Sequence, residues 1–230
     1  MLKNQIINLK IIEKVASTLG ELNNDVIYVG GAVVSLYVTD KGAEQPRPTK
    51  DIDISVQIST YAQMDLLRIK LAEKRIFPSA SGTVMYRYQF EDILLDFIPY
   101  EETPLGPTNS WLKPGFKKAY PVTIGNIEIK ILPVSLFLAT KWEAFKSRGN
   151  DPRTSHDFED IIYIIDNNLN LVDDALKADK NVQVFLKEMS NEIMLHSNRN
   201  EIIESHLNPY TRDERREIVI NKLERILEIK

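Results

Sequence analysis

The chain has 230 residues, of which 43% are hydrophobic and 27% charged, so it can bury the core of one large domain or of two small ones. It has no cysteine, which excludes disulfides, thiolate zinc sites and cysteine nucleophiles. The net charge of −4 disfavours a general nucleic-acid binder. The sequence shows neither an apolar run of about 18 residues nor a signal-peptide pattern, so we expect a cytoplasmic protein without a membrane partner.

The N-terminal part of the chain predicts alternating helices and strands. Apolar residues at helical spacing predict a helix over 5–19, which Gly20 can end. A short apolar run predicts a buried strand over 26–29, followed at once by Gly30-Gly31. We further predict the start of a helix over 32–37, a polar loop over 39–50, a helix over 59–75 and a loop over 101–118, with strands over 51–56, 84–90, 93–98, 122–124 and 127–131. The buried stripe predicted for the helix over 59–75 is Tyr61, Met64, Leu67, Ile69 and Leu71.

After residue 133 the pattern changes to helices alone. These are predicted over 134–147, 155–167, 171–177, 181–197 and 212–229. We therefore predict an α+β protein in which an α/β domain over 1–133 is followed by a helical domain over 134–230.

Gly30-Gly31 lies between a predicted strand and a predicted helix. Glycine lets the backbone come close to a ligand because it has no β-carbon. The N-terminus of the following helix would point free N–H groups at the same place, which suits a phosphate. The alternative interpretation of the same pattern is a simple tight turn.

Asp51 and Asp53 are two residues apart on a predicted strand, so both side chains project from one face. Neighbouring carboxylates repel each other, and a bound Mg²⁺ removes that repulsion because hard cations take carboxylate oxygens. Ile52, Ile54 and Val56 give the strand a dry opposite face. The alternative is a solvated strand face without a metal.

Asp96 lies in an otherwise apolar strand, where an acid without a partner is unfavourable. If this strand neighbours that of Asp51, three carboxylates converge, which is enough to hold two metal ions about 3.5–4 Å apart. The alternative is a buried aspartate paired with a basic residue such as Arg87.

Taken together, Gly30-Gly31, the Asp51-Ile52-Asp53 strand and a third aspartate on a later strand resemble the signature of the polymerase β-like nucleotidyltransferase superfamily. Residues 47–54, Arg-Pro-Thr-Lys-Asp-Ile-Asp-Ile, are similar to the Arg-x-(Ser/Thr)-x-Asp-h-Asp-h segment (h is apolar) of AbiEii-type nucleotidyltransferases, the toxin half of type IV abortive-infection systems. Residues 141–148 and 156–160 resemble that family's helical Lys-x-x-Ala…Arg…Asp-x-x-Asp pattern. The resemblance covers roughly residues 26–165. It implies a nucleotidyltransferase α/β domain with a mixed sheet, followed by a helical bundle.

The resemblance also implies roles for the matching residues. Asp51 and Asp53 would bind Mg²⁺ or Mn²⁺, and Asp96 would be a third metal ligand or the base at the acceptor hydroxyl. The residues that would contact the NTP triphosphate are Gly30, Gly31, Arg47 and Thr49. Lys141 would neutralise phosphate charge, and Asp157 would support the site from the helical part, with Asp160 as a rival for that position. The loop between Gly31 and Asp51 is longer than the family pattern, and 41–46 could act as a lid.

The resulting functional hypothesis is a metal-dependent enzyme that moves an NMP from an NTP to an acceptor hydroxyl. The acceptor would be RNA or tRNA in a toxin-like role, with an antitoxin protein as a candidate partner. An acidic net charge favours the alternative of a small cationic acceptor, as in aminoglycoside nucleotidyltransferases. A third hypothesis is a nucleotide-binding protein without turnover, against which the intact pair of Asp51 and Asp53 argues.

Overall fold

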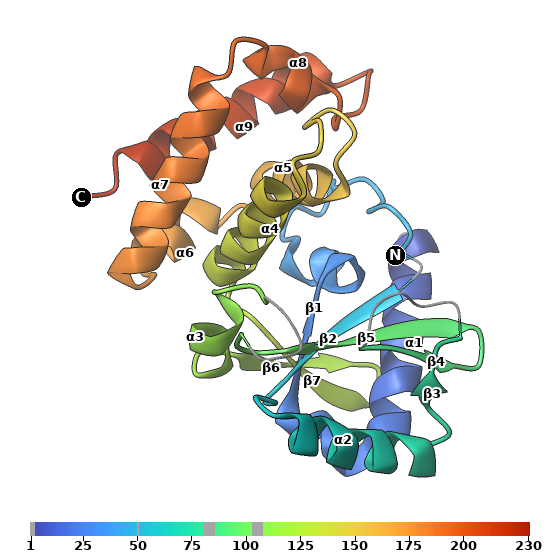
Figure 1. Cartoon of the computed structure of the whole chain (residues 1–230). Coiled ribbons are helices and arrows are strands. Elements are labelled where there is room, and N and C mark those ends of the chain that lie inside the picture. The colour runs from blue at the N-terminus through green and yellow to red at the C-terminus, as the bar shows by residue number, and fades with distance from the viewer. Residues whose placement is uncertain (1–2, 50, 81–85, 103–107) are drawn as a thin grey trace. The chain divides into compact units, whose positions relative to one another are not determined.

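The chain forms two compact units in the computed structural model (Figure 1), which describes residues 3–49, 51–80, 86–102 and 108–230. The sheet unit comprises Met1–Ser35 and Gln45–Pro133, and the helical unit comprises Leu36–Glu44 and Val134–Lys230. The predicted α+β class, with a mixed sheet followed by helices, is confirmed. A division into independent domains at residue 133 stays a prediction.

Within its described residues the sheet unit holds seven strands, three helices and two 3₁₀ segments, the second of which continues into the helical unit. In chain order its described elements are α1 (Lys3–Leu19), η1 (Gly20–Asp25), β1 (Val26–Val29), η2 (Gly31–Tyr37), β2 (Asp51–Val56), α2 (Tyr61–Glu73), β3 (Phe77–Pro78), β4 (Arg87–Phe90), β5 (Ile93–Pro99), α3 (Leu112–Phe116), β6 (Tyr120–Ile124) and β7 (Ile127–Ile131).

The strands form one mixed sheet in the order β3-β4-β5-β2-β1-β7-β6. The pairs β2–β5 and β1–β7 are parallel, and the other neighbours are antiparallel. All four residues of β1 are buried, as expected for a central strand. This order places β2, the strand of Asp51 and Asp53, beside β5, the strand of Asp96.

Local sequence signals explain several element boundaries. Gly20 and Gly125 both have positive φ, 58° in each case, which a glycine adopts without strain at the end of a helix or in a hairpin turn. The start of α2 is a capping box in which the Thr60 side chain accepts a hydrogen bond from the N–H of Gln63, and the Gln63 side chain accepts one from the N–H of Thr60.

Several sequence predictions differ from the structure, and part of one further prediction lies outside the described residues. The segment after Gly30 is a seven-residue 3₁₀ helix, not an α-helix. The predicted loop over 101–118 contains α3, and β3 and the later α8 were not predicted, because such short elements carry little periodicity. In α2, Met64 and Leu71 are buried but Tyr61 and Ile69 are exposed, since the helix buries only one narrow stripe. The first residues of the strand predicted over 84–90 lie outside the described residues.

The helical unit is built from α4 (Val134–Arg148), α5 (His156–Asn167), α6 (Leu171–Leu176), α7 (Lys180–Leu195), α8 (Arg199–Glu204) and α9 (Arg212–Leu227). Its core is formed by fully buried apolar side chains from different helices, among them Phe137, Ile161, Leu186 and Leu223. None of the helices within the described ranges combines the length and apolar character needed to cross a bilayer.

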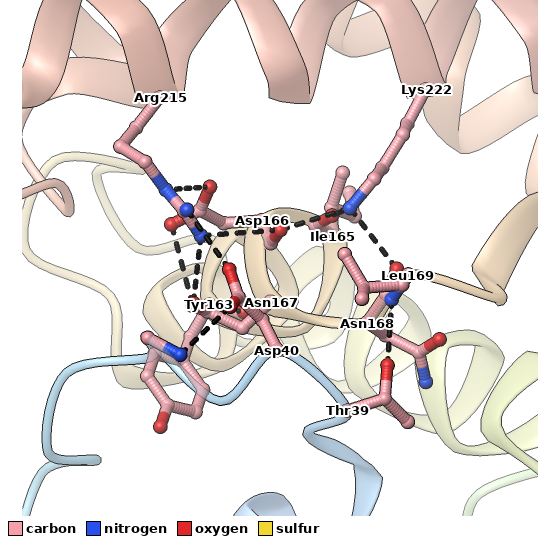
Figure 2. Close-up of polar contacts among 11 residues, drawn as sticks. Thr39, Asp40, Tyr163, Ile165, Asp166, Asn167, Asn168, Leu169, Arg215 and Lys222 are labelled. Carbon is pink, nitrogen blue, oxygen red and sulfur yellow. Dashed lines mark hydrogen bonds and ion pairs between the residues drawn. The ribbon is translucent and has the colours of Figure 1, made fainter.

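The helical unit also contains a segment from much earlier in the chain, Leu36–Glu44, which we call the strap. The backbone N–H groups of Thr39 and Asp40 donate to the carbonyl of Asn167, at 3.1 and 3.0 Å. The side chain of Asn168 donates to the Tyr37 carbonyl at 2.7 Å. The strap is therefore fixed on the C-terminal end of α5 (Figure 2).

Two basic side chains of α9 bind polar groups at this end of α5 (Figure 2). Arg215 pairs with Asp166 at 2.7 Å and with Asp40 of the strap at 3.0 Å. The buried Lys222 donates from Nζ to the carbonyls of Ile165, Asp166 and Asn168, at 2.6, 2.9 and 3.0 Å. A cation here satisfies the carbonyls that a helix leaves free at its C-terminus.

Candidate active site

Asp51 and Asp53 lie on the same face of β2, as the strand period requires. Both side chains are half-buried, whereas Ile52 and Ile54 between and after them are buried in the core. The side chain of Asp51 is 39% exposed, so one of the two carboxylates is open to a ligand from solvent. The expected alternation of a polar and a dry face is confirmed.

Asp96 joins this face from the neighbouring strand. In the parallel pairing of β2 with β5, Asp53 lies opposite Asp96, so the two carboxylates project on the same side of the sheet. Three aspartates thus come from two adjacent strands, while only 13% of the Asp96 side chain is exposed. Their roles as metal ligands stay predictions.

Arg87 is the partner of Asp96. It lies opposite Asp96 in the antiparallel pair of β4 and β5, and donates from Nε and Nη2 to the two carboxylate oxygens at 2.7 and 2.6 Å. The same Nη2 is 3.4 Å from Oδ2 of Asp51. The hydrogen bonds to Asp96 raise the pKa of the Arg87 guanidinium above its usual value, so its charge is permanent. The interpretation of Asp96 as a buried acid paired with Arg87 is therefore what the structure shows.

The two glycines before η2 make room for charged side chains. Gly30 has φ of +72°, and a β-carbon there would overlap the carboxylate of Asp53. A β-carbon on Gly31 would lie 2.6 Å from Nη2 of Arg47. The absence of both β-carbons lets the side chains of Asp53 and Arg47 pack against the turn. Because η2 is so short, its N-terminus gives no support to the predicted phosphate site.

Thr49 orients Asp51. Its hydroxyl lies 2.9 Å from the Asp51 carbonyl oxygen and 3.2 Å from Oδ1 of the Asp51 side chain. The hydroxyl has a single proton to donate, so these two oxygens of Asp51 share it, and the carbonyl is the nearer acceptor. The predicted contact of Thr49 with the triphosphate stays a prediction. Lys50, between Thr49 and Asp51, lies outside the described residues.

Lys141 and Asp157 belong to the helical unit. Lys141 on α4 is only 7% exposed at its side chain, and Nζ lies 2.6 Å from Asp160 and 3.3 Å from Asp157. Arg148 also pairs with Asp157. Both rival acids, Asp157 and Asp160, thus contact Lys141 in one buried ion-pair cluster. The predicted roles of Lys141 in phosphate binding and of Asp157 in catalysis remain untested predictions.

From the sequence, Arg87 is only one example of a possible partner for Asp96, although the turn between their two strands predicts this pairing directly. The Glu91-Asp92 turn joins β4 and β5, and a two-residue turn fixes which residues face each other. Phe90 pairs with Ile93, so Arg87 must face Asp96. The contact from Arg87 to Asp51 additionally needs the order of β5 and β2, which the local sequence does not contain.

The donor chemistry of Asp51 and Asp53 suits a hard divalent cation. Carboxylate oxygens are the ligands that Mg²⁺ and Mn²⁺ prefer, and the two side chains share one face. Asp96 already accepts two hydrogen bonds from a guanidinium. Within the described ranges no group of three or more acidic or histidine side chains is arranged to hold a metal ion. Asp51 and Asp53 are therefore the pair that fits.

Comparisons with known proteins give similarities at the level of structure. No protein-family model and no curated protein sequence matches this chain. The crystal structure of JHP933 from Helicobacter pylori matches 99% of this chain and 94% of its own, with 11% identity and a TM-score of 0.52. An antigenic nucleotidyltransferase-like protein from Paracoccidioides brasiliensis matches 90% of this chain and 96% of its own, with 15% identity and a TM-score of 0.49. The likeness to JHP933 shows the fold alone.

Proposed function

We propose that this protein is a divalent-cation-dependent nucleotidyltransferase that moves an NMP from an NTP to an acceptor hydroxyl. One observation carries the proposal. Asp51 and Asp53 stand side by side on one face of β2, with Asp53 against Gly30 and the guanidinium of Arg47 against Gly31. Paired carboxylates beside a cationic group are suited to a metal-bound triphosphate.

Each residue of this face has a proposed task. Asp51 and Asp53 would hold Mg²⁺ or Mn²⁺, and a cation bound there supplies positive charge to the phosphates. Arg47 would contact the triphosphate, and Thr49 keeps the carboxylate of Asp51 oriented. In the reaction the acceptor oxygen bonds to the α-phosphorus, the bond to the bridging oxygen breaks, pyrophosphate leaves and the acceptor hydroxyl loses its proton. The protein contributes mainly position and charge.

The acceptor is proposed from the resemblance to AbiEii-type enzymes: RNA, with a tRNA end as the first candidate, in a toxin-like role with an antitoxin partner. A small cationic acceptor is the second candidate, favoured by the net charge of −4. Acidic surface attracts cationic substrates and repels polynucleotides.

The test is incubation of the purified protein with Mg²⁺ and each α-³²P-labelled NTP, with total RNA as the acceptor in one set of reactions and an aminoglycoside in a parallel set. The Asp51→Asn/Asp53→Asn double variant removes both charges without changing side-chain volume, and Asp92→Asn, in the exposed turn before β5, is the control for one lost charge. We expect labelled RNA with wild type and Asp92→Asn, and a loss of at least about 10³-fold in the double variant. Label in the double variant would overturn the proposal, and label only on an aminoglycoside would move the acceptor to the second candidate.

A further inference from the structure

The ion pair of Arg87 with Asp96 differs from a surface salt bridge. Nε and Nη2 bind separate oxygens of one carboxylate, which is the geometrically specific arrangement of an arginine fork. The side chains are 28% and 13% exposed, so solvent replaces little of the interaction. Both residues lie opposite each other in a regular strand pair, and the backbone keeps them in place.

Two carboxylates compete for the guanidinium of Arg87. Its Nη2 lies 2.6 Å from Asp96 and 3.4 Å from Asp51, so the contact with Asp96 is the shorter one. Asp51 is the next acceptor in reach. If Asp96 lost its charge, the partly buried guanidinium of Arg87 would lose its two-point partner, and Asp51 already lies 3.4 Å from the same nitrogen.

We infer that Asp96 is a positioning residue that binds Arg87 in the shorter, two-point ion pair and so limits the contact of Arg87 with Asp51 to the longer one at 3.4 Å. Asp51 and Asp53 can then bind a divalent cation, and Asp96 does not bind the cation itself. The inference rests on the proposed function, because it assigns the metal-binding pair of that site. It replaces the predicted set of three metal ligands with two ligands and one charge-matched ion pair.

Two charge-neutralising variants distinguish a positioning role of Asp96 from a role as a metal ligand. In the Asp96→Asn variant Arg87 is released toward Asp51, and we expect Mn²⁺ binding by the full chain, measured by isothermal titration, to weaken about tenfold. In the Arg87→Gln/Asp96→Asn double variant no guanidinium remains to compete. We expect its affinity for Mn²⁺ to return to within about threefold of wild type.

If Asp96 binds the metal itself, the variants should show a different pattern of Mn²⁺ affinities. If Asp96 is a metal ligand, the double variant binds Mn²⁺ as weakly as Asp96→Asn does, and the inference fails. It also fails if Asp96→Asn binds Mn²⁺ like wild type, or if wild type does not bind Mn²⁺ at all. Should Asp96→Asn not fold, Arg87→Gln is compared with Arg87→Gln/Asp96→Asn. Equal affinities of the two for Mn²⁺ support the inference, and weaker binding by the double variant makes Asp96 a ligand and overturns it.

Two further readouts keep the inference separate from the proposed function. Urea unfolding of the four proteins identifies variants that lose affinity only because they are unfolded. RNA labelling is measured on the same preparations. Absence of RNA labelling in wild type would count against RNA as the acceptor, whereas the pattern of Mn²⁺ affinities alone decides the role of Asp96.

Discussion

At the Gly30-Gly31 turn, neighbouring side chains occupy the space that β-carbons would need. The carboxylate of Asp53 occupies the space where a β-carbon of residue 30 would lie, and Arg47 occupies the corresponding space at residue 31. Sequence reasoning assigned this space to a phosphate, because a glycine pair after a strand suggests ligand approach. The structure instead fills it with the side chains that we propose to bind that phosphate and its cation.

We predict that Gly30→Ala destabilises the protein more than a glycine substitution with backbone strain alone. A left-handed residue costs about 1–2 kcal/mol when it carries a β-carbon. At Gly30 the overlap with Asp53 adds to that cost, whereas Gly149, with φ of +61°, has nothing within 4 Å of its β-carbon position. Urea unfolding of Gly30→Ala and Gly149→Ala measures the difference. Equal losses in the two variants would show that Asp53 moves aside freely.

The hydroxyl of Thr49 gives a second prediction at this scale. Thr49→Val keeps the side-chain shape but removes the contact with Asp51, while Thr49→Ser keeps it. The loss of one hydrogen bond of about 1 kcal/mol corresponds to about a fivefold lower rate of nucleotide transfer in Thr49→Val. Thr49→Ser should stay near wild type. A deficit shared by both variants would assign the effect to packing of the methyl group.

At the scale of elements, the sequence predicts local structure well and pairing less well. The helix α2 illustrates the difference: the capping residue Thr60 marks its start, yet which of its apolar side chains are buried depends on the part of the protein that it packs against. The strand of Asp51 and Asp53 follows from alternation alone, and the facing of Arg87 and Asp96 follows from the turn between their strands. The parallel neighbourhood of β2 and β5 is a long-range pairing, which no local pattern specifies.

The contact of the strap with α9 gives a prediction on pH dependence. The backbone N–H of Gly42 and the guanidinium of Arg215 hold the pKa of Asp40 below its usual 3.8. Below 3.8 the unfolded chain takes up a proton at this position before the folded chain does, so stability is present above that pH and is lost as the pH falls through the lowered pKa. Burial raises the pKa of the neighbouring Asp166, which acts with the opposite sign.

We therefore expect the free energy of unfolding to depend less steeply on pH in the acid range for Asp40→Asn than for wild type. Urea unfolding of wild type and Asp40→Asn is compared between about pH 5 and pH 3. The gap between the two proteins should be largest at the upper end and narrow on acidification. Asp173→Asn, an exposed substitution on α6, controls for the loss of one negative charge and should run parallel to wild type. A constant gap for Asp40→Asn would contradict the lowered pKa.

For the whole molecule, we expect the strap to couple the unfolding of the two units. The chain passes from the sheet unit to the helical unit at Ser35, returns after Glu44 and leaves again after Pro133, and η2 runs through the first of these passages. The strap is joined to the sheet unit at both of its ends. Unfolding of the helical unit would therefore release the strap, including the end that leads into Arg47 and Thr49. This connectivity favours one cooperative transition, in contrast to two domains that are divided at residue 133.

The two tryptophans of the chain allow this to be measured, because Trp111 lies in the sheet unit and Trp142 in the helical unit. In Trp111→Phe the fluorescence follows the helical unit, and in Trp142→Phe it follows the sheet unit. For each variant the fluorescence midpoint in urea is compared with the far-UV circular dichroism midpoint of the same sample, which removes any effect of the substitution on stability itself. We expect coincident midpoints in both variants. If the fluorescence of one variant changes well before or after its circular dichroism, the units unfold separately and the strap does not couple them; the boundary predicted at 133 would then divide two independent domains.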